Sequence, residues 1–439
     1  MGTASLFTNL SEVEERQPAQ FATTPEAARV VGAVRNQVEM MWRDLDSLVA
    51  EDHPARAIWG LLERLDLAGF YAQVRAVQGR AGRPATDPRV LLALWVYATV
   101  EGIGSARHLA ELTERDDVFR WLRGGVPLNY HLLADFRTAH QGALNELLTE
   151  IITALLAEEL VSLKRVAQDG MRVRASAGAA SFRREQTLER LRQEAAEQVE
   201  RLAAEVTQAG GQASQQERAA RQRAAQERAQ RVAQALAQVA AVRALKETPE
   251  EQAKARVSTT DPDARVMKMA DGGFRPAFNV QLATDTESQV VVGVTVTNQG
   301  TDTEEAPPME EQIEARTGQR PEEYLVDGGF APKQTVTTLA PRDITVYAPV
   351  QKPKDPTRNA YDPLKGDAAA VAAWRQRMGT PEAKAIYTER AATAECVNAR
   401  CRAHYGLQQF PVRGLPKVAC VVLFTVIAHN LLRWLALAA

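Results

Sequence analysis

The first 150 residues show the three- and four-residue spacing of apolar side chains that is typical of amphipathic helices. In "HPARAIWGLLERL" this spacing places Ile58 and Leu65 on one helix face. The stretch "TDPRVLLALWVYATVEG" predicts a helix with Asp87 as its N-cap and Pro88 in its first turn. We therefore expect residues 1–150 to form an all-α N-terminal domain. Short helices separated by glycine turns suit a helix-turn-helix-like DNA-binding module, although many all-helical domains share this pattern.

Beyond residue 160 the apolar side chains alternate with period two, as in β-strands. "KRVAQDGMRVRASAG" predicts a strand at residues 163–176. "FRPAFNVQLATD" and "SQVVVGVTVTN" predict an antiparallel pair with a turn near Thr286 to Ser288. The later segments predict, in order, a helix in "DTEEAPPMEEQIEARTG", a short strand in "EEYLVDGG", a helix in "PKQTVTTLA", a strand in "DITVYAPV" and helices from about Thr380.

This order of elements predicts a multi-domain α+β chain. Three strands precede a helix and two strand–helix units follow, which is the order of a ribonuclease-H-like mixed sheet with helices on both faces. The tight turn between the second and third strands excludes folds in which the first strands are parallel. We expect this ribonuclease-H-like domain to span residues 160–439.

Residues 181–247 interrupt the α/β pattern and are rich in Arg, Glu, Gln and Ala. Their apolar side chains recur at helical spacing on both sides of Gly210 and Gly211, at Leu188, Leu191, Ala195, Val199, Leu202, Val206, Val232, Leu236, Val239 and Val242. This predicts an antiparallel helical hairpin of coiled-coil type, inserted at residues 181–255. A solvated spacer, a dimerisation arm and a DNA-touching arm all fit the pattern.

Net charge, cysteine spacing and the N-terminal sequence limit which partners and which cellular compartment we expect. The net charge of −2 excludes a uniformly basic nucleic-acid binder, so binding to DNA must depend on local patches. The three cysteines lack a paired C-x-x-C spacing and predict neither a disulfide framework nor a zinc site, which fits a cytoplasmic protein. The N-terminal stretch "MGTASLFTNLSEVEERQ" has no apolar core and does not predict a signal peptide.

The apolar run at residues 418–439 is long enough to cross a membrane. His429, Asn430 and Arg433 interrupt it, and such groups are costly in a bilayer. We therefore expect a buried C-terminal helix and no membrane contact.

Three carboxylates lie at positions that favour a metal-binding catalytic site. Asp169 lies among the apolar residues of the first strand, where an unpaired charge is costly. Asp327 ends the fourth strand, and Glu395 lies on a late helix, where Glu382 and Glu389 compete with it. Carboxylates that converge in this way form a site of oxygen ligands that suits Mg²⁺, and two such ions suit phosphodiester chemistry. Alternatively, Asp169 pairs with a buried arginine or caps a turn.

Basic residues gather near these acids. From Pro381 to the C-terminus Lys and Arg outnumber Asp and Glu, and Arg172 and Arg174 lie in the first strand. On a helix with 100° per residue, Tyr387, Glu395 and Arg402 share one face. These cations are candidate phosphate contacts, although most of them individually could be ordinary solvated charges.

Several separate motifs, in the same order, make the chain resemble the DDE transposases of bacterial insertion sequences. The resemblance runs from about Asp52 to Trp434. The matching stretches are "GRPATDPRVLLALWVYATVEGIGSARHLAEL", "NYHLLADFR", "VAQDGMRVRASAGAASFRR", "STTDPDARVMKMADGGFRPAFNVQLATDT", "EEYLVDGGF", "IYTERAATAECVNARCR" and "VRGLPKV…AHNLLR".

The resemblance implies that Asp169, Asp327 and Glu395 are the catalytic, metal-binding DDE triad. It also implies that Tyr387, Arg390, Glu395 and Arg402 form the family's tyrosine-arginine-glutamate-lysine signature. Arg402 stands where lysine is usual, and the gap between Arg390 and Glu395 is one residue longer than in the commonest version.

The implied activity is cleavage at the element's terminal inverted repeats, followed by attack of the freed 3′-hydroxyl on target DNA. The resemblance implies two Mg²⁺ ions as the cofactor, with Mn²⁺ as a substitute. Double-stranded DNA would be the substrate, a homodimer would assemble on it, and the protein would associate with the nucleoid.

Other polar residues have weaker assignments. Asn279 and Gln281 either support the site or touch DNA, unless they only bond at a strand edge. Asp302 is an extra acid, and His131, His404 and His429 are expected to be structural.

Two alternatives stay open. The chain could be an inactive, transposase-derived DNA-binding protein, although acids at all three positions oppose this. It could also be another ribonuclease-H-like nuclease, such as a resolvase. Inverted repeats flanking the gene would favour the transposase.

Overall fold

The computed structural model describes residues 43–76, 84–208, 212–353, 355 and 357–439. The chain divides into two compact units, Met1–Asp44 and Leu45–Ala439, and the description below concerns the second. The N-terminal stretch of the sequence and the predicted interruption at Gly210 and Gly211 lie outside the described residues.

The described residues between 45 and 157 are mainly helical, as the apolar spacing predicts. A short 3₁₀ turn, Asp46–Leu48, is followed by α1 (Pro54–Arg64), α2 (Ala68–Tyr71), α3 (Pro88–Val100), α4 (Ala106–Arg115), α5 (Asp117–Arg123), α6 (Tyr130–Ala139) and α7 (Gln141–Ala157). The expected start of α3 is confirmed, since the Asp87 carboxylate accepts a hydrogen bond from the Arg89 amide at 2.8 Å. The expected domain limits of 1–150 and 160–439 remain a prediction.

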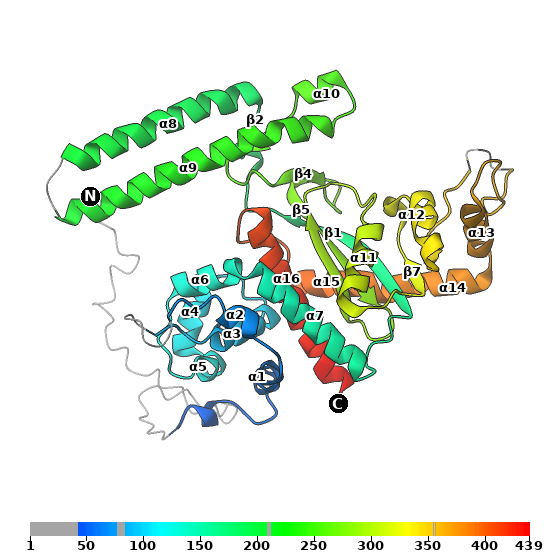
Figure 1. The fold of residues 1–439 in the computed structure, drawn as a ribbon, viewed down its shortest axis with the longest axis horizontal. Helices are drawn as coiled ribbons and strands as arrows, with labels where there is room; N and C mark the ends of the chain where they lie inside the picture. Colours follow the sequence, from blue (N-terminus) through cyan, green and yellow to red (C-terminus); the bar gives the residue numbers. More distant parts are fainter. Residues whose placement is uncertain (1–42, 77–83, 209–211, 354, 356) are drawn as a thin grey trace, which may run out of the picture. The chain divides into compact units, whose positions relative to one another are not determined.

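A mixed six-stranded sheet forms the centre of the α/β part (Figure 1). Its strands are β1 (Arg165–Arg174), β4 (Arg265–Lys268), β5 (Phe274–Asp285), β6 (Val291–Thr297), β7 (Glu323–Leu325) and β8 (Thr345–Tyr347). β1 lies between β5, with which it is antiparallel, and β7, with which it is parallel. β8 extends the sheet in parallel beyond β7, and β4 and β6 both pair with the other edge of β5.

The predicted β5–β6 hairpin is confirmed, including its turn. The Asp285 carboxylate accepts hydrogen bonds from the amide and the hydroxyl of Ser288. The sequence pattern did not predict β4, because four residues with an exposed edge carry too little alternation. β7 is also shorter than expected, so that Asp327 lies two residues beyond its end.

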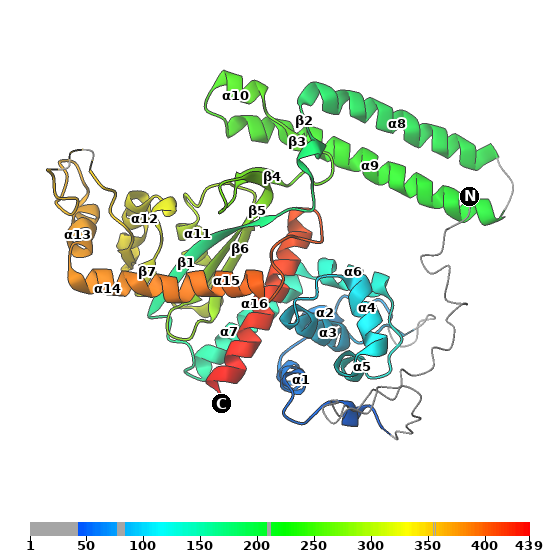
Figure 2. The same ribbon diagram turned by 180° about the vertical axis from the view of Figure 1, so that it is seen from behind.

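Helices cover both faces of the sheet (Figures 1 and 2). α11 (Ala306–Thr317) lies on one face, while α14 (Pro381–Arg390) and α15 (Cys396–Ala403) cross the other. The remaining helices of this part are α12 (Pro332–Leu339), α13 (Ala369–Met378) and α16 (Leu415–Leu437), with 3₁₀ turns at Gly328–Phe330 and Ala340–Arg342. The helix expected from Asp302 begins only at Ala306, because residues 302–305 form a turn.

The C-terminal helix α16 packs against α3, α7 and β6. Among the described residues it is the one helix long and apolar enough to cross a membrane, but 72% of its most apolar stretch is buried within the protein. Polar side chains of α16 hydrogen-bond to the backbone of the β5–β6 hairpin. The Asn430 amide bonds to both the N–H and the C=O of Val291, and His429 Nε2 lies 2.8 Å from the Gln289 carbonyl.

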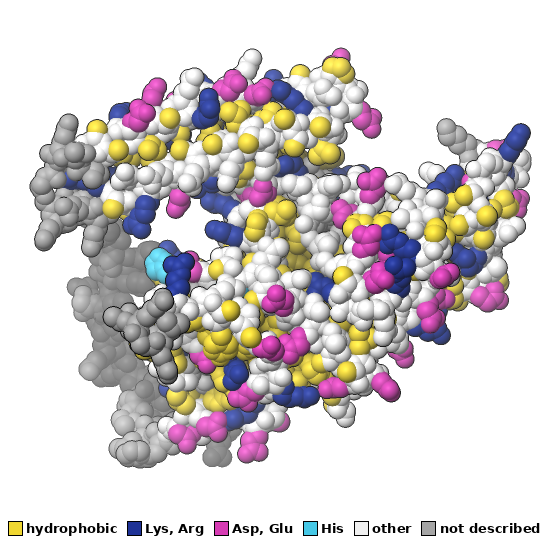
Figure 3. All heavy atoms as spheres, in the orientation of Figure 1, with side chains coloured by type: hydrophobic (Ala, Val, Ile, Leu, Met, Phe, Trp, Pro, Cys, Tyr) yellow, Lys and Arg dark blue, Asp and Glu magenta, His cyan; other side chains and the backbone are white. Residues whose placement is uncertain are grey.

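The predicted helical hairpin lies between β1 and β4 in the chain. It consists of α8 (Glu185–Gln208) and α9 (Gln212–Ala244), followed by α10 (Pro249–Ala253). Short strands β2 (Phe182–Arg183) and β3 (Val257–Ser258) pair at its base, after a 3₁₀ turn at Ala179–Ser181. Apolar side chains line the junction of the two long helices (Figure 3), and its buried core includes Leu188, Ala235, Val239 and Val242.

Two aspartates connect the base of the hairpin to α16. Asp263 accepts hydrogen bonds from the Gln238 side chain at 2.5 Å and from the Leu415 amide at 2.9 Å. Asp261 is buried and accepts a bond from the Gly414 amide. The exit of the hairpin therefore satisfies amides at the start of α16, which would otherwise lack partners.

Candidate active site

Asp169 lies in the middle of β1 and points to the face covered by α14 and α15. One of its oxygens accepts a hydrogen bond from Arg390 Nη2 at 2.7 Å, and the other accepts one from Asn398 Nδ2 at 2.8 Å. Burial raises the pKa of Asp169 above its usual value, and the positive charge of Arg390 opposes this. Asp169 therefore pairs with a buried arginine, as one of the two sequence interpretations expected.

Asp327 reaches the same arginine from the end of β7. Its carboxylate caps the short turn Gly328–Phe330 by accepting a hydrogen bond from the Gly329 amide at 2.7 Å. Its other oxygen lies 3.8 Å from Arg390 Nη2, and 39% of its side chain is exposed. β1 and β7 pair in parallel, so Asp169 on β1 and Asp327, two residues beyond the end of β7, lie on neighbouring segments of the sheet.

Glu395 lies in the turn between α14 and α15, on the helical side of the site. Its Oε1 accepts a hydrogen bond from Arg390 Nη1 at 2.7 Å, and 53% of its side chain is exposed. The turn between the two residues, Ala391–Glu395, is π-helical and contains one residue more than an α-helical turn. This turn accommodates the longer spacing in the sequence, so that Arg390 and Glu395 remain neighbours.

Arg390 is the point at which the three acids meet. Only 9% of its side chain is exposed. Burial by itself would lower its pKa, but the surrounding carboxylates, Asp169 first, raise it above the usual value. Tyr387, one turn earlier, is half-buried beside this cluster, and burial raises its pKa. The cluster is thus three anions around one buried cation.

The donor set fits a hard metal ion in its chemistry. All three acids offer carboxylate oxygens, and their geometry already surrounds a positive charge. Within the described part of the chain, however, no three Asp, Glu, His or Cys side chains are close enough to hold a metal as they stand. A metal ion bound by these three acids would therefore compete with Arg390 for their oxygens.

The competing acids are placed elsewhere. Glu389 pairs with Arg165 at 2.5 Å, at the start of β1, and Arg165 also pairs with Glu323. Glu382 is exposed in the first turn of α14. Neither residue joins the cluster around Arg390.

The other predicted phosphate contacts lie along β1 and α15. Arg174 is exposed. Arg172 Nη2 donates to Asp302 at 2.8 Å and to the Gly300 carbonyl at 3.1 Å. Arg402 approaches the Arg172 carbonyl at 3.5 Å. Arg172 and Arg174 thus lie on the same strand as Asp169, and Arg402 lies on α15.

Asn398 is a site residue that the sequence interpretation missed. It lies three residues after Glu395, and this helical spacing could have indicated that it shares a face with the acid. An asparagine without charge gave no other signal.

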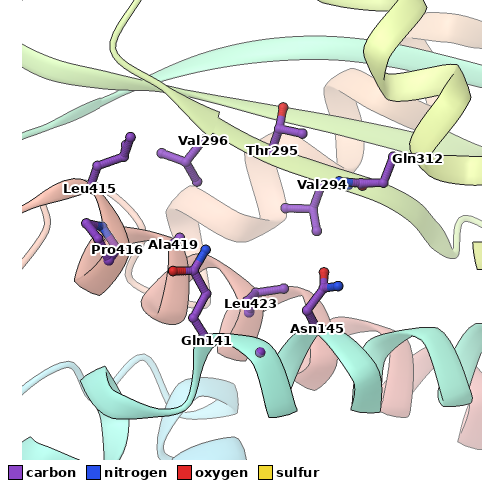
Figure 4. Close-up of a pocket in the computed structure, with 11 residues that line it drawn as sticks. Gln141, Asn145, Val294, Thr295, Val296, Gln312, Leu415, Pro416, Ala419 and Leu423 are labelled. Carbon is purple, nitrogen blue, oxygen red and sulfur yellow. The ribbon is translucent and has the colours of Figure 1, made fainter. Parts of the chain in front are cut away.

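Two cavities are separate from the three acids. One of about 580 Å³ lies between α7, β6 and α16 and is lined by residues such as Gln141, Val294 and Leu423 (Figure 4). Its lining contains no ionisable side chain. A larger hollow of about 930 Å³, bordered by α6, α9 and the segment that leads into α16, carries four acids and four basic residues, Arg137, Arg231, Arg413 and Lys417.

Comparison with known families supplies the assignment. Residues 43–139 match the model of a transposase domain (DUF772), and residues 363–435 match the model of a transposase DDE domain. The second match contains Tyr387, Arg390, Glu395 and Arg402. Comparison with curated proteins and with solved structures gives no match. The two family matches, one over the N-terminal helices and one over the C-terminal acid-bearing helices, support the assignment of this chain as a DDE transposase of an insertion sequence.

Proposed function

We propose that this transposase binds the terminal inverted repeats of its insertion sequence and catalyses metal-dependent DNA cleavage and strand transfer. Asp169, Asp327 and Glu395 are the catalytic carboxylates. The observation that carries the proposal is their convergence, from a strand, a strand end and a helix, on the single guanidinium of Arg390.

The strand order supports a ribonuclease-H-like core for residues 160–439. Three antiparallel strands, β1, β5 and β6, precede α11, and the parallel strands β7 and β8 follow. The carboxylates then fall in the first strand, beyond the fourth principal strand and on a late helix. This is the arrangement that the sequence motifs imply.

Mg²⁺, with Mn²⁺ as a substitute, is the expected cofactor, in two sites. Asp169 and Asp327 would hold one ion, and Glu395 would complete the second site. Such ions activate water and stabilise the attacking and leaving oxygens of a phosphodiester.

Arg390 balances the charge of the acids before DNA binds. A DNA phosphate offers the guanidinium an alternative anion, so the arginine can move from the carboxylates to the substrate. Tyr387 and Arg402 flank this path from the helical side. Of the two β1 arginines, Arg174 is exposed while Asp302 holds Arg172, so Arg174 is the stronger candidate for a phosphate contact.

The remaining parts have supporting roles in this proposal. The helical domain, residues 1–150, binds the element ends, and the insertion at 181–255 extends the surface available to DNA or to a second protomer. Two DNA ends must meet for transposition, which calls for a homodimer on DNA. The protein then works in the cytoplasm at the nucleoid.

A cleavage assay on the element's own ends, read from the DNA that flanks the gene, tests the proposal. Wild type and Asp327→Ala are compared in Mg²⁺, in Mn²⁺ and in chelator, with Asp271→Ala, an exposed acid on the β4–β5 turn, as the matched control. Nicking that is lost in Asp327→Ala and in chelator, but kept in the control, supports it.

Two other results would assign a different function. Binding of the ends without cleavage in either metal would indicate an inactive DNA-binding descendant. Cleavage of branched DNA that lacks the repeats would indicate a resolvase.

A further inference from the structure

A fourth carboxylate lies beneath the two proposed catalytic aspartates, on the opposite face of β1. Asp302, in the turn before α11, is 6% exposed. One of its oxygens accepts hydrogen bonds from Asn279 Nδ2 at 2.8 Å and Gln281 Nε2 at 2.6 Å. The other accepts a bond from Arg172 Nη2 at 2.8 Å. Three donors on two strands therefore converge on this single acid.

Two glycines allow Asp302 to approach the site closely. Gly170 directly follows Asp169, and a Cβ at this position would lie 2.3 Å from one Asp302 oxygen and 2.4 Å from Gln281 Nε2. A Cβ on Gly329 would lie 3.0 Å from an Asp327 oxygen and 3.5 Å from the other Asp302 oxygen. Neither glycine has a φ in the left-handed region, so contact and not backbone conformation explains the glycine at 170.

The turn that carries Asp302 also touches the Asp327 loop directly. Thr303 Oγ1 donates a hydrogen bond to the Gly329 carbonyl at 3.5 Å. Residues 302 and 303 thus contact the chain beside both aspartates, of which Asp169 lies on β1 and Asp327 lies beyond the end of β7.

We infer that Asp302 is a positioning residue, which supports the backbone beside Asp169 and the loop beside Asp327 and thereby sets the separation of the two carboxylates. The inference rests on the proposed function, in which Asp169 and Asp327 bind the catalytic metal ions. Neutral Asn at 302 would present N–H groups to a site that already holds N–H donors. At least one buried polar group would then lack a partner, and the support would loosen.

The experiment measures Mn²⁺ binding to the full-length protein without DNA, by the paramagnetic resonance signal of the free ion. The variants are Asp302→Asn, Gly170→Ala and their combination, with Gly178→Ala as the control because a Cβ there meets nothing within 4 Å. Binding of the element ends in chelator and the melting temperature are measured on the same samples. The positioning role predicts at least tenfold weaker Mn²⁺ binding for Asp302→Asn and at least fivefold weaker binding for Gly170→Ala.

The combined variant separates a shared contact from general damage. If both changes act through the contact between Asp302 and Gly170, the combined variant binds Mn²⁺ as tightly as the single variant with the lower Mn²⁺ affinity. All variants should then bind the DNA ends like wild type. Wild-type Mn²⁺ binding by Asp302→Asn would overturn the inference. If Asp302→Asn does not fold, Gly170→Ala decides: weakened binding supports the inference and wild-type binding overturns it.

Cleavage of the element ends by the wild type, measured in parallel, distinguishes a failure of the proposed function from a failure of the Asp302 inference. A wild type that binds Mn²⁺ but does not cleave the ends contradicts the proposed function, while the Mn²⁺ binding of the variants still tests Asp302. A wild type that binds no Mn²⁺ contradicts both.

Discussion

Arg390 donates a hydrogen bond of 2.7 Å to Glu395, five residues later, across a π-helical turn. Through the same guanidinium the glutamate comes within reach of Asp169, which lies more than 200 residues earlier in the chain. This one cation therefore joins the helical and the sheet parts of the proposed site.

Arg390→Gln is expected to tighten metal binding in the absence of DNA. The substitution removes the cation that occupies the centre of the three acids, so an incoming ion no longer competes with it. We expect about tenfold tighter Mn²⁺ binding, or about 1.4 kcal/mol, together with impaired cleavage of the ends. Titration calorimetry on the DNA-free protein checks this, with Arg275→Gln, which breaks an exposed ion pair, as the control. Equal or weaker Mn²⁺ binding by Arg390→Gln would contradict the expectation.

Removal of the exposed Ala391 is expected to leave the site intact. The deletion converts the π-helical turn into a regular α-helical one and keeps Arg390 and Glu395 as neighbours, now four residues apart. We expect the melting temperature to change by less than about 2 °C. Deletion of the exposed Ala385, within the regular part of α14, rotates the residues on its two sides relative to each other. This deletion should clearly lower the melting temperature. A loss of stability that is equal in the two deletions would rule out this role for the π turn.

The elements and the candidate acids could be predicted from the sequence, because both depend on local patterns. Period-two alternation identifies β1 and exposes Asp169 as an exception among apolar residues, and Asp87 marks the start of α3. The arrangement around the acids could not be predicted. The longer spacing of Arg390 and Glu395 is visible in the sequence but does not by itself indicate a π-helical turn. The position of Asp302 against Gly170 has no local pattern, because these two residues lie far apart in the sequence.

His429 predicts a specific dependence of stability on pH. Burial lowers the pKa of this histidine to about 4, from 6.5 in the unfolded chain. Below pH 6.5 the unfolded chain gains a proton that the folded protein does not, so stability falls as the pH drops from about 6.5 to about 4. The loss amounts to about 3 kcal/mol. Urea unfolding of wild type and His429→Gln over this range checks it. The variant should lack this component, whereas His108→Gln, at an exposed histidine, should keep it.

Asp263→Ala is expected to destabilise the junction between the hairpin and α16. It removes the acceptor of the Leu415 amide and of the Gln238 side chain. We expect a loss of about 1–2 kcal/mol in the free energy of unfolding. Denaturant unfolding measures the loss. Asp271→Ala, whose side chain is exposed, should show no measurable change, and an equal effect in both variants would argue against the capping role.

The central claim, that the three converging acids are metal ligands in DNA cleavage, is tested most directly by a change of ligand. Asp169→Cys, Asp327→Cys and Glu395→Cys replace a hard oxygen by a soft sulfur, which disfavours Mg²⁺ more than Mn²⁺. We predict that each variant loses cleavage of the element ends in Mg²⁺ and regains part of it in Mn²⁺, while the matching alanine variants stay inactive in both metals. Cleavage by the cysteine variants that is equal in the two metals, or undiminished in Mg²⁺, would contradict the claim.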